Sequence, residues 1–93
     1  MKPHQTPSYV TRWVVTHYNE KMDVRELVGP MQGRRTYATR REAKAQLQAM
    51  LDNNTEATLR QFYGLPLAVQ KCQCYPGHFD PVRRYFPILG KAR

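Results

Sequence analysis

Hydrophobic and polar residues alternate most regularly between residues 9 and 18, and this stretch predicts the clearest β-strand of the chain. One predicted face carries Tyr9, Thr11, Trp13, Val15 and His17, and the other carries Val10, Arg12, Val14, Thr16 and Tyr18. Large side chains on both faces indicate a sheet that is covered on both sides. We therefore expect a helix on one face and a second subunit, in a homodimer, on the other.

Shorter apolar segments between turn signals predict further strands. Polar residues 19–23 predict a turn after the first strand, and Gly29 with Pro30 interrupts the second. The second to fifth predicted strands occupy residues 24–28, 34–37, 67–75 and 82–86. The first three would form a meander that leads directly into a helix.

The helix that follows has a strong start signal. Thr39 is a preferred N-cap residue and Glu42 lies three positions later, which is the capping-box arrangement. Apolar residues at helical spacing then predict a helix over residues 40–51 with one buried stripe. A shorter helix is expected over residues 57–63, ended by Gly64 as its C-cap and by Pro66.

The predicted order is β-β-β-α-α-β-β, an α+β fold with a small, mostly antiparallel sheet of about five strands and one main helix on one face. With 93 residues, the chain has room for a single domain. We expect that domain over residues 9–87, a flexible N-terminal arm over residues 1–8 and a frayed C-terminal tail over residues 88–93.

Composition adds a strong positive charge to this outline. The net charge is +8 and the pI is about 9.9, with more arginine than lysine. Arginine suits bidentate contacts to phosphates, so an anionic partner such as nucleic acid is expected. No apolar run resembles an export signal or a membrane span, which predicts a cytoplasmic protein with reduced thiols and no membrane partner.

The basic residues concentrate around the predicted helix start. They could clamp phosphates together with the helix dipole. Arg40 and Arg41 stand in the first helical turn, where acids are favoured, and a local rule broken without structural gain indicates function. The alternative is a solvated charged face. The candidate phosphate-binding residues are Arg12, Arg34, Arg35, Arg40, Arg41 and Lys44.

Aromatic residues of the first strand form a second candidate surface. Tyr9, Trp13 and Tyr18 could stack a base or bury a partner in a dimer. A single tryptophan on a strand that faces an amphipathic helix is, however, more often part of the core.

The third candidate is a metal or thiol site at Cys72, Cys74, His78 and Asp80. Its spacing differs from that of common zinc sites, and Cys72 and Cys74 would share one strand face, which favours burial in the core. A catalytic role for a cysteine and a histidine lacks a third orienting group, and paired carboxylates and a glycine-rich phosphate loop are missing. We therefore predict no enzyme, no cofactor, no bound metal and no small-molecule substrate.

Two resemblances to known proteins bear on function. Residues 9–51 resemble the three-strand-plus-helix layout of Arm-type DNA-binding domains of tyrosine recombinases, with matching positions at Trp13, Gly33, Arg34, Arg35, Thr39, Glu42 and Ala43. In that family the sheet enters the DNA major groove, which would implicate Arg12, Arg34 and Arg35. The additional segment 54–86 departs from that family.

The C-terminal half looks like the ending of small uncharacterised bacterial proteins carried on mobile elements, including integron cassettes. The matching run covers residues 74–82, with Tyr85 and Phe86, and a helix start over residues 37–43. The resemblance implies no activity. Together these features predict a non-catalytic basic accessory protein of a mobile element that binds nucleic-acid phosphates. The alternative is a homodimeric protein–protein interaction module.

Overall fold

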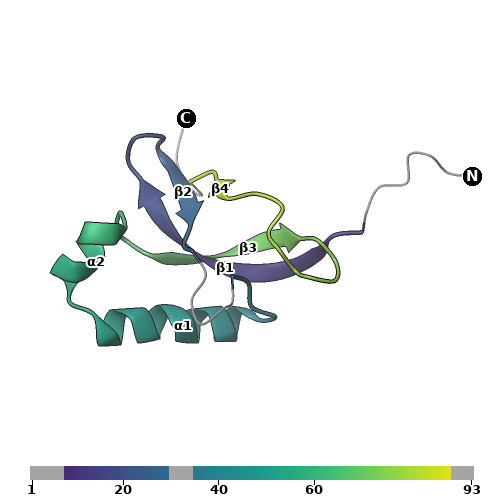
Figure 1. The fold of residues 1–93 in the computed structure, drawn as a ribbon, viewed down its shortest axis with the longest axis horizontal. Coiled ribbons are helices and arrows are strands. Elements are labelled where there is room, and N and C mark those ends of the chain that lie inside the picture. The colour runs from purple at the N-terminus through teal and green to yellow at the C-terminus, as the bar shows by residue number, and fades with distance from the viewer. Residues whose placement is uncertain (1–7, 30–34, 89–93) are drawn as a thin grey trace, which may run out of the picture.

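A computed structural model describes residues 8–29 and 35–88 of the chain (Figure 1). Six elements are present in this part: β1 (Val10–Asn19), β2 (Val24–Leu27), α1 (Arg40–Asn53), α2 (Glu56–Phe62), β3 (Ala68–Cys74) and β4 (Tyr85–Phe86). The strands form one antiparallel sheet in the order β3-β1-β2-β4. The predicted α+β class is therefore confirmed, with a four-stranded sheet and two helices. The predicted arm and tail fall largely outside the described residues.

The long strand β1 is the centre of the sheet. The predicted turn after it is confirmed, because Asp23 has a φ of 56° and its amide donates to the Asn19 carbonyl at 2.8 Å. Strand β2 thus returns along one edge of β1, from Thr16 opposite Leu27 to Asn19 opposite Val24. Strand β3 pairs with most of the opposite edge, from Val10 opposite Cys74 to Thr16 opposite Ala68.

The predicted third strand is wrong in the part of it that the structure describes. Residues 35–37 contribute a single bridge, in which Trp13 and Tyr37 exchange two hydrogen bonds of 2.9 Å. The reason is competition for one edge of β1. Strand β2 pairs with the C-terminal end of that edge, and the Val28 amide extends the pairing to the Val15 carbonyl. Thr39 already caps α1 two residues after Tyr37, so this segment pairs with β1 at Trp13 alone.

The predicted fifth strand is shorter than expected, because the C-terminal segment crosses the sheet instead of following one edge. Pro81 forms a bridge with Cys74 at the β3 edge, and Tyr85–Phe86 then pairs with β2 at the opposite edge. Figure 1 shows this yellow-green segment running over the side of the sheet away from α1. It covers the face that the sequence assigned to a second subunit.

Each face of the sheet therefore has its own core. Helix α1 and the segments around it cover one face, in a cluster of buried residues that contains Val15, Val28, Tyr37, Ala43, Met50 and Leu59. The second cluster contains Val14, Cys72, Cys74 and Phe86, with Leu27 packed against it. Homodimer formation remains a prediction, but an uncovered apolar face no longer supports it.

The predicted start signal of α1 is confirmed, and the predicted C-cap of α2 is wrong. Thr39 Oγ1 accepts from the Glu42 amide at 3.1 Å, and Glu42 Oε1 accepts from the Thr39 amide at 3.3 Å, so the capping box is complete. Gly64 follows the C-cap residue of α2, Tyr63, and its role differs from the predicted one. A Cβ at this position would overlap the Tyr18 carbonyl, so the glycine is needed for close backbone approach.

Candidate nucleic-acid interface

The basic residues at the start of α1 are exposed, as a phosphate-binding role requires. Arg40, Arg41 and Lys44 all lie on the solvent side of the helix, while Ala43 is fully buried between them. A carboxylate already stands at the helix N-terminus, because Glu42 folds back and accepts from the amides of Ala38 and Thr39. These cations can therefore attract an anion, but the capping carboxylate opposes anion binding at the helix end.

Arg12 has a different environment from the other predicted cations. Its Nε donates to Thr36 Oγ1 at 2.9 Å, and its Nη2 donates to the Thr36 carbonyl at 3.2 Å. The guanidinium carbon lies 4.4 Å from the centroid of the Phe79 ring, within the range of a cation–π contact. Arg12 thus connects β1 to two loops. Arg34 lies outside the described residues.

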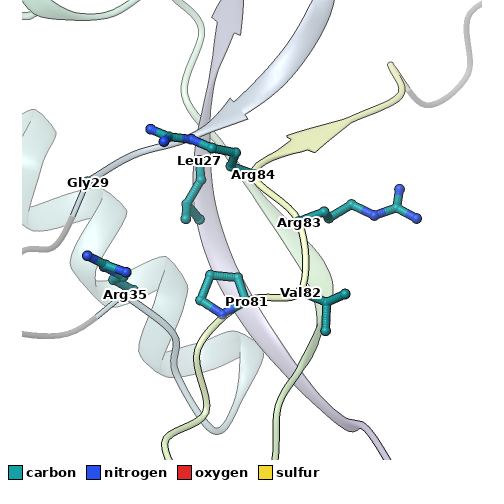
Figure 2. A pocket seen from close by; sticks show the side chains of 7 residues that line it. All are labelled: Leu27, Gly29, Arg35, Pro81, Val82, Arg83 and Arg84. Carbon is teal, nitrogen blue, oxygen red and sulfur yellow. The ribbon is translucent and has the colours of Figure 1, made fainter. Parts of the chain in front are cut away.

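Arg35 lines a groove of about 350 Å³ together with two arginines from the other end of the chain (Figure 2). The 7 lining residues are Leu27, Gly29, Arg35, Pro81, Val82, Arg83 and Arg84, and none of them is acidic. In Figure 2 the side chains of Arg35 and Arg84 flank one side of the groove, and that of Arg83 points away on the opposite side. We call the surface made by Arg35, Arg83 and Arg84 the basic groove.

Arg83 and Arg84 were missed by the sequence interpretation. They form an Arg-Arg pair between Pro81-Val82 and Tyr85-Phe86, which is a basic doublet like Arg34-Arg35. This doublet was the feature of the sequence that could have indicated a second basic site. Its position next to Arg35 could not be predicted, because it depends on the C-terminal segment crossing the sheet to the groove that Arg35 lines.

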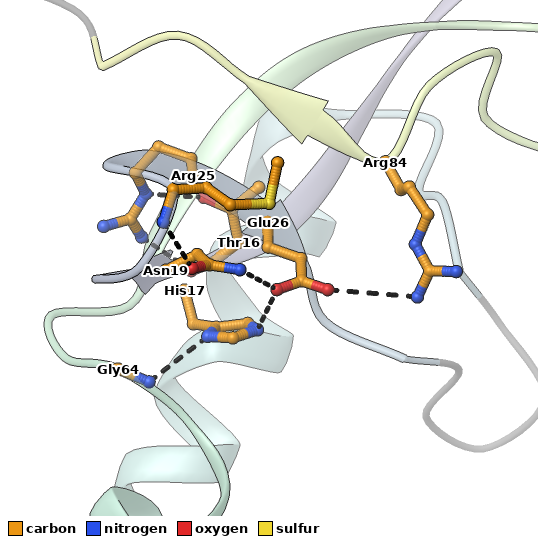
Figure 3. Close-up of polar contacts among 8 residues, drawn as sticks. Thr16, His17, Asn19, Arg25, Glu26, Gly64 and Arg84 are labelled. Atoms are coloured by element: carbon orange, nitrogen blue, oxygen red, sulfur yellow. Dashed lines mark hydrogen bonds and ion pairs between the residues drawn. The ribbon is translucent and has the colours of Figure 1, made fainter.

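A polar network beside the groove orients one acid toward Arg84 (Figure 3). Glu26 Oε1 accepts from Asn19 Nδ2 at 2.9 Å and lies 3.6 Å from His17 Nε2, while Oε2 lies 4.0 Å from a terminal nitrogen of Arg84. His17 Nδ1 accepts from the Gly64 amide at 3.2 Å, so the neutral ring carries its proton on Nε2. The network links β1, β2 and the loop before β3. It leaves Arg84 mostly exposed, at 68% of its side chain.

The predicted aromatic partner residues do not form one surface. Trp13 packs against the α1-side core, with Lys71 Nζ 5.8 Å from its ring centroid. Tyr18 lies on the opposite strand face and donates to Asp23 Oδ1 at 2.8 Å, a hydrogen bond that raises the pKa of the tyrosine. Tyr9 is 40% exposed, and its ring lies 5.8 Å from that of Tyr75.

The proposed metal and thiol residues are divided between core and surface. Cys72 and Cys74 are buried in the second core cluster, and burial raises the pKa of Cys72 to about 12 and also raises that of Cys74. His78 and Asp80 lie exposed in the loop that follows β3. Within residues 8–29 and 35–88, no three histidine, cysteine or acidic side chains come together as metal ligands.

Comparisons of this chain with protein families, with curated proteins and with solved structures find no match. Neither helix of the described part is long and apolar enough to cross a membrane. A functional proposal for this chain therefore depends on the chemistry of its own surfaces.

Proposed function

We propose that this protein is non-catalytic and binds nucleic acid by its phosphates, through the basic groove and the exposed cations at the start of α1. The observation that supports this proposal is the composition of the groove. Arginines from two segments about half the chain apart line one concave surface, and no carboxylate is among the lining residues. Guanidinium groups bind phosphate oxygens through two parallel hydrogen bonds, so this arrangement suits a phosphate backbone.

The proposed site differs in part from the one expected from the sequence. Arg40, Arg41 and Lys44 provide exposed charge, as the sequence predicted. Arg12 is instead held by Thr36 and Phe79. Arg83 and Arg84, which the sequence interpretation did not include, line the groove. The resemblance of residues 9–51 to Arm-type domains agrees with a nucleic-acid ligand. An origin on a mobile element remains part of the proposal and rests on the C-terminal resemblance.

The test is fluorescence anisotropy with labelled DNA over a salt series. We expect Arg35→Gln combined with Arg83→Gln and Arg84→Gln to weaken binding for all sequences and to reduce the salt slope on duplex DNA by about 2 to 3. Arg40→Gln with Arg41→Gln should reduce the slope by less than about 2, because these two side chains are not among the residues that line the groove.

A control removes two charges on other parts of the surface, the same number as the Arg40 and Arg41 variant removes. Lys21→Gln removes an exposed charge in the β1–β2 turn, and Arg60→Gln breaks an exposed ion pair with Glu56 that parallels the pair of Arg84 with Glu26. This control should change the salt slope by well under 1. Equal slopes in the groove variant and the control would contradict the proposal. A dimer that binds no DNA in gel filtration with light scattering would support the alternative of a protein-interaction module.

A further inference from the structure

Three exposed aromatic residues lie around the end of the sheet where β1 begins and β3 ends. Tyr9 is 40% exposed, Tyr75 is 45% exposed and Phe79 is 38% exposed. Val10 pairs with Cys74, so Tyr9 and Tyr75 follow as neighbours, and their rings meet edge to face at 78°. The Phe79 amide donates to the Tyr75 carbonyl at 2.9 Å, which places the third aromatic in the same turn. We call these three residues the aromatic end.

The loop holds Phe79 in a backbone conformation that phenylalanine rarely adopts. Its φ is 59°, in the left-handed region, and Gly77 two residues earlier has a φ of 91°. Two hydrogen bonds fix the loop in this form: the Tyr75 amide donates to the Asp80 carbonyl at 2.8 Å, and Thr36 Oγ1 donates to the Phe79 carbonyl at 2.9 Å. An observed backbone outlier held by its surroundings is grounds for a functional hypothesis.

Arg12 sets the orientation of the Phe79 ring. Its guanidinium stacks on one face of the ring at 4.4 Å and is itself held by Thr36. Because the planar Arg12 guanidinium covers one face of the Phe79 ring, a planar ligand would stack on the opposite face. Nucleobases stack on aromatic faces of this kind without regard to sequence.

The aromatic end continues directly into the basic groove. Phe79 and Asp80 precede Pro81 and Val82, which line the groove, and Thr36 joins the Phe79 loop to the segment of Arg35. Asp80 makes the loop less positively charged than the groove. The loop is therefore better suited to bind uncharged bases, and the groove is better suited to bind phosphates.

From this juxtaposition we propose that the ligand of this surface is single-stranded nucleic acid, whose unpaired bases stack on Phe79, Tyr75 and Tyr9 while its phosphates follow the basic groove. The inference rests on the proposed nucleic-acid binding. In a duplex the bases are stacked on one another already and cannot reach an aromatic ring without unpairing, so stacking selects single strands.

The test compares three fluorescein-labelled probes of about 15 nucleotides, a length that spans one small binding domain. The probes are oligothymidine, an abasic strand with the same number of phosphates, and a mixed-sequence duplex. Wild-type protein should bind oligothymidine at least about fivefold more tightly than the abasic strand, since each stacked base contributes a factor of about 5 to 150.

The variant Tyr75→Leu with Phe79→Leu removes two of the three aromatic rings. Leucine is apolar, similar in size and, like tyrosine and phenylalanine, not branched at Cβ. It should lose at least about fivefold in oligothymidine affinity and bind the abasic strand as the wild type does. The control Phe62→Leu changes an aromatic that is 69% exposed on α2, and it should change no affinity. Circular dichroism melting of each variant confirms that it is folded.

Two failures are distinguishable. If the wild type binds none of the probes near physiological salt, the proposed nucleic-acid function fails, and this inference fails with it. If the wild type binds oligothymidine and the abasic strand equally, and the leucine variant matches it on both, the function stands and base stacking is overturned. A loss of affinity in the leucine variant that is equal for both strands would also overturn stacking.

Discussion

Arg25 offers a sharp test of what stabilises the sheet, because its buried guanidinium donates two hydrogen bonds to one residue of the neighbouring strand. Arg25 is 9% exposed, and its Nε donates to Thr16 Oγ1 at 3.0 Å while its Nη2 donates to the Thr16 carbonyl at 2.7 Å. Thr16 is fully buried, and Figure 3 shows the two side chains side by side across β1 and β2. The substitution Thr16→Val removes the hydroxyl and keeps the branched shape.

The expected cost follows from the contact that is lost. A hydrogen bond to a charged group contributes about 1.5–3 kcal/mol, and a buried donor left without its partner adds its own desolvation penalty. The bond to the Thr16 carbonyl remains, because the backbone is unchanged. We therefore expect Thr16→Val to lower the free energy of unfolding by about 2 kcal/mol, equivalent to a fall in Tm of about 8–16 °C.

The second perturbation is Arg25→Met, alone and combined with Thr16→Val. In the single variant the Thr16 hydroxyl keeps acceptors in the Ala68 carbonyl at 3.4 Å and Gln70 Oε1 at 3.3 Å. In the double variant no buried charge is left unpaired, so it should be more stable than Thr16→Val by about 1–2 kcal/mol. Burial lowers the pKa of Arg25, but arginine stays protonated near neutral pH, so the effect should not vary between about pH 6 and 8.

The assay is urea unfolding of the four proteins in a double-mutant cycle, followed by Trp13 fluorescence and far-ultraviolet circular dichroism. Coincident transitions from both signals would establish two-state unfolding. A coupling energy below about 0.5 kcal/mol would refute the reasoning, since independent sites add within that range. A cost of Thr16→Val under about 0.5 kcal/mol would refute it as well.

Three further predictions concern other elements. Gly64→Ala should destabilise the protein by at least about 2 kcal/mol through overlap with the Tyr18 carbonyl, whereas Gly29→Ala, with open space around the added Cβ, should be neutral or slightly stabilising; equal Tm values would contradict this. Thr39→Ala should cost about 1 kcal/mol by removing the cap of α1, and an unchanged urea midpoint would contradict the capping role. The folded pKa of Cys72, about 12, exceeds the ordinary thiol value of 9.0, so this thiol's contribution to stability is complete below about pH 9 and is lost as pH rises toward 12. Cys72→Ala should reduce that alkaline loss of stability without abolishing it, because the pKa values of Cys74 and Tyr18 are also raised. A dependence of stability on pH identical to that of the wild type would contradict the assignment.

Features that depend on contacts between near neighbours could be predicted from the order of the amino acids. The capping box of Thr39 and Glu42 spans three residues, and the turn at residues 19–23 closes over five, so both follow from local chemistry. The period-two pattern of residues 9–18 correctly indicated a strand covered on both faces. The α+β class follows from the same local patterns.

The way in which distant segments share the edges and faces of β1 follows from the complete fold. Residues 35–37 were reduced to one bridge because β2 occupies the same edge, and the second face was covered by residues 75–86 of the same chain. Both outcomes depend on competition between segments for hydrogen bonds and apolar surface, which hydrophobic periodicity does not encode. The same long-range folding bound Arg12 to Phe79 and joined Arg35 to Arg83 and Arg84. The candidate site is therefore a product of topology, because charge along the chain becomes a binding surface only where the fold brings it together.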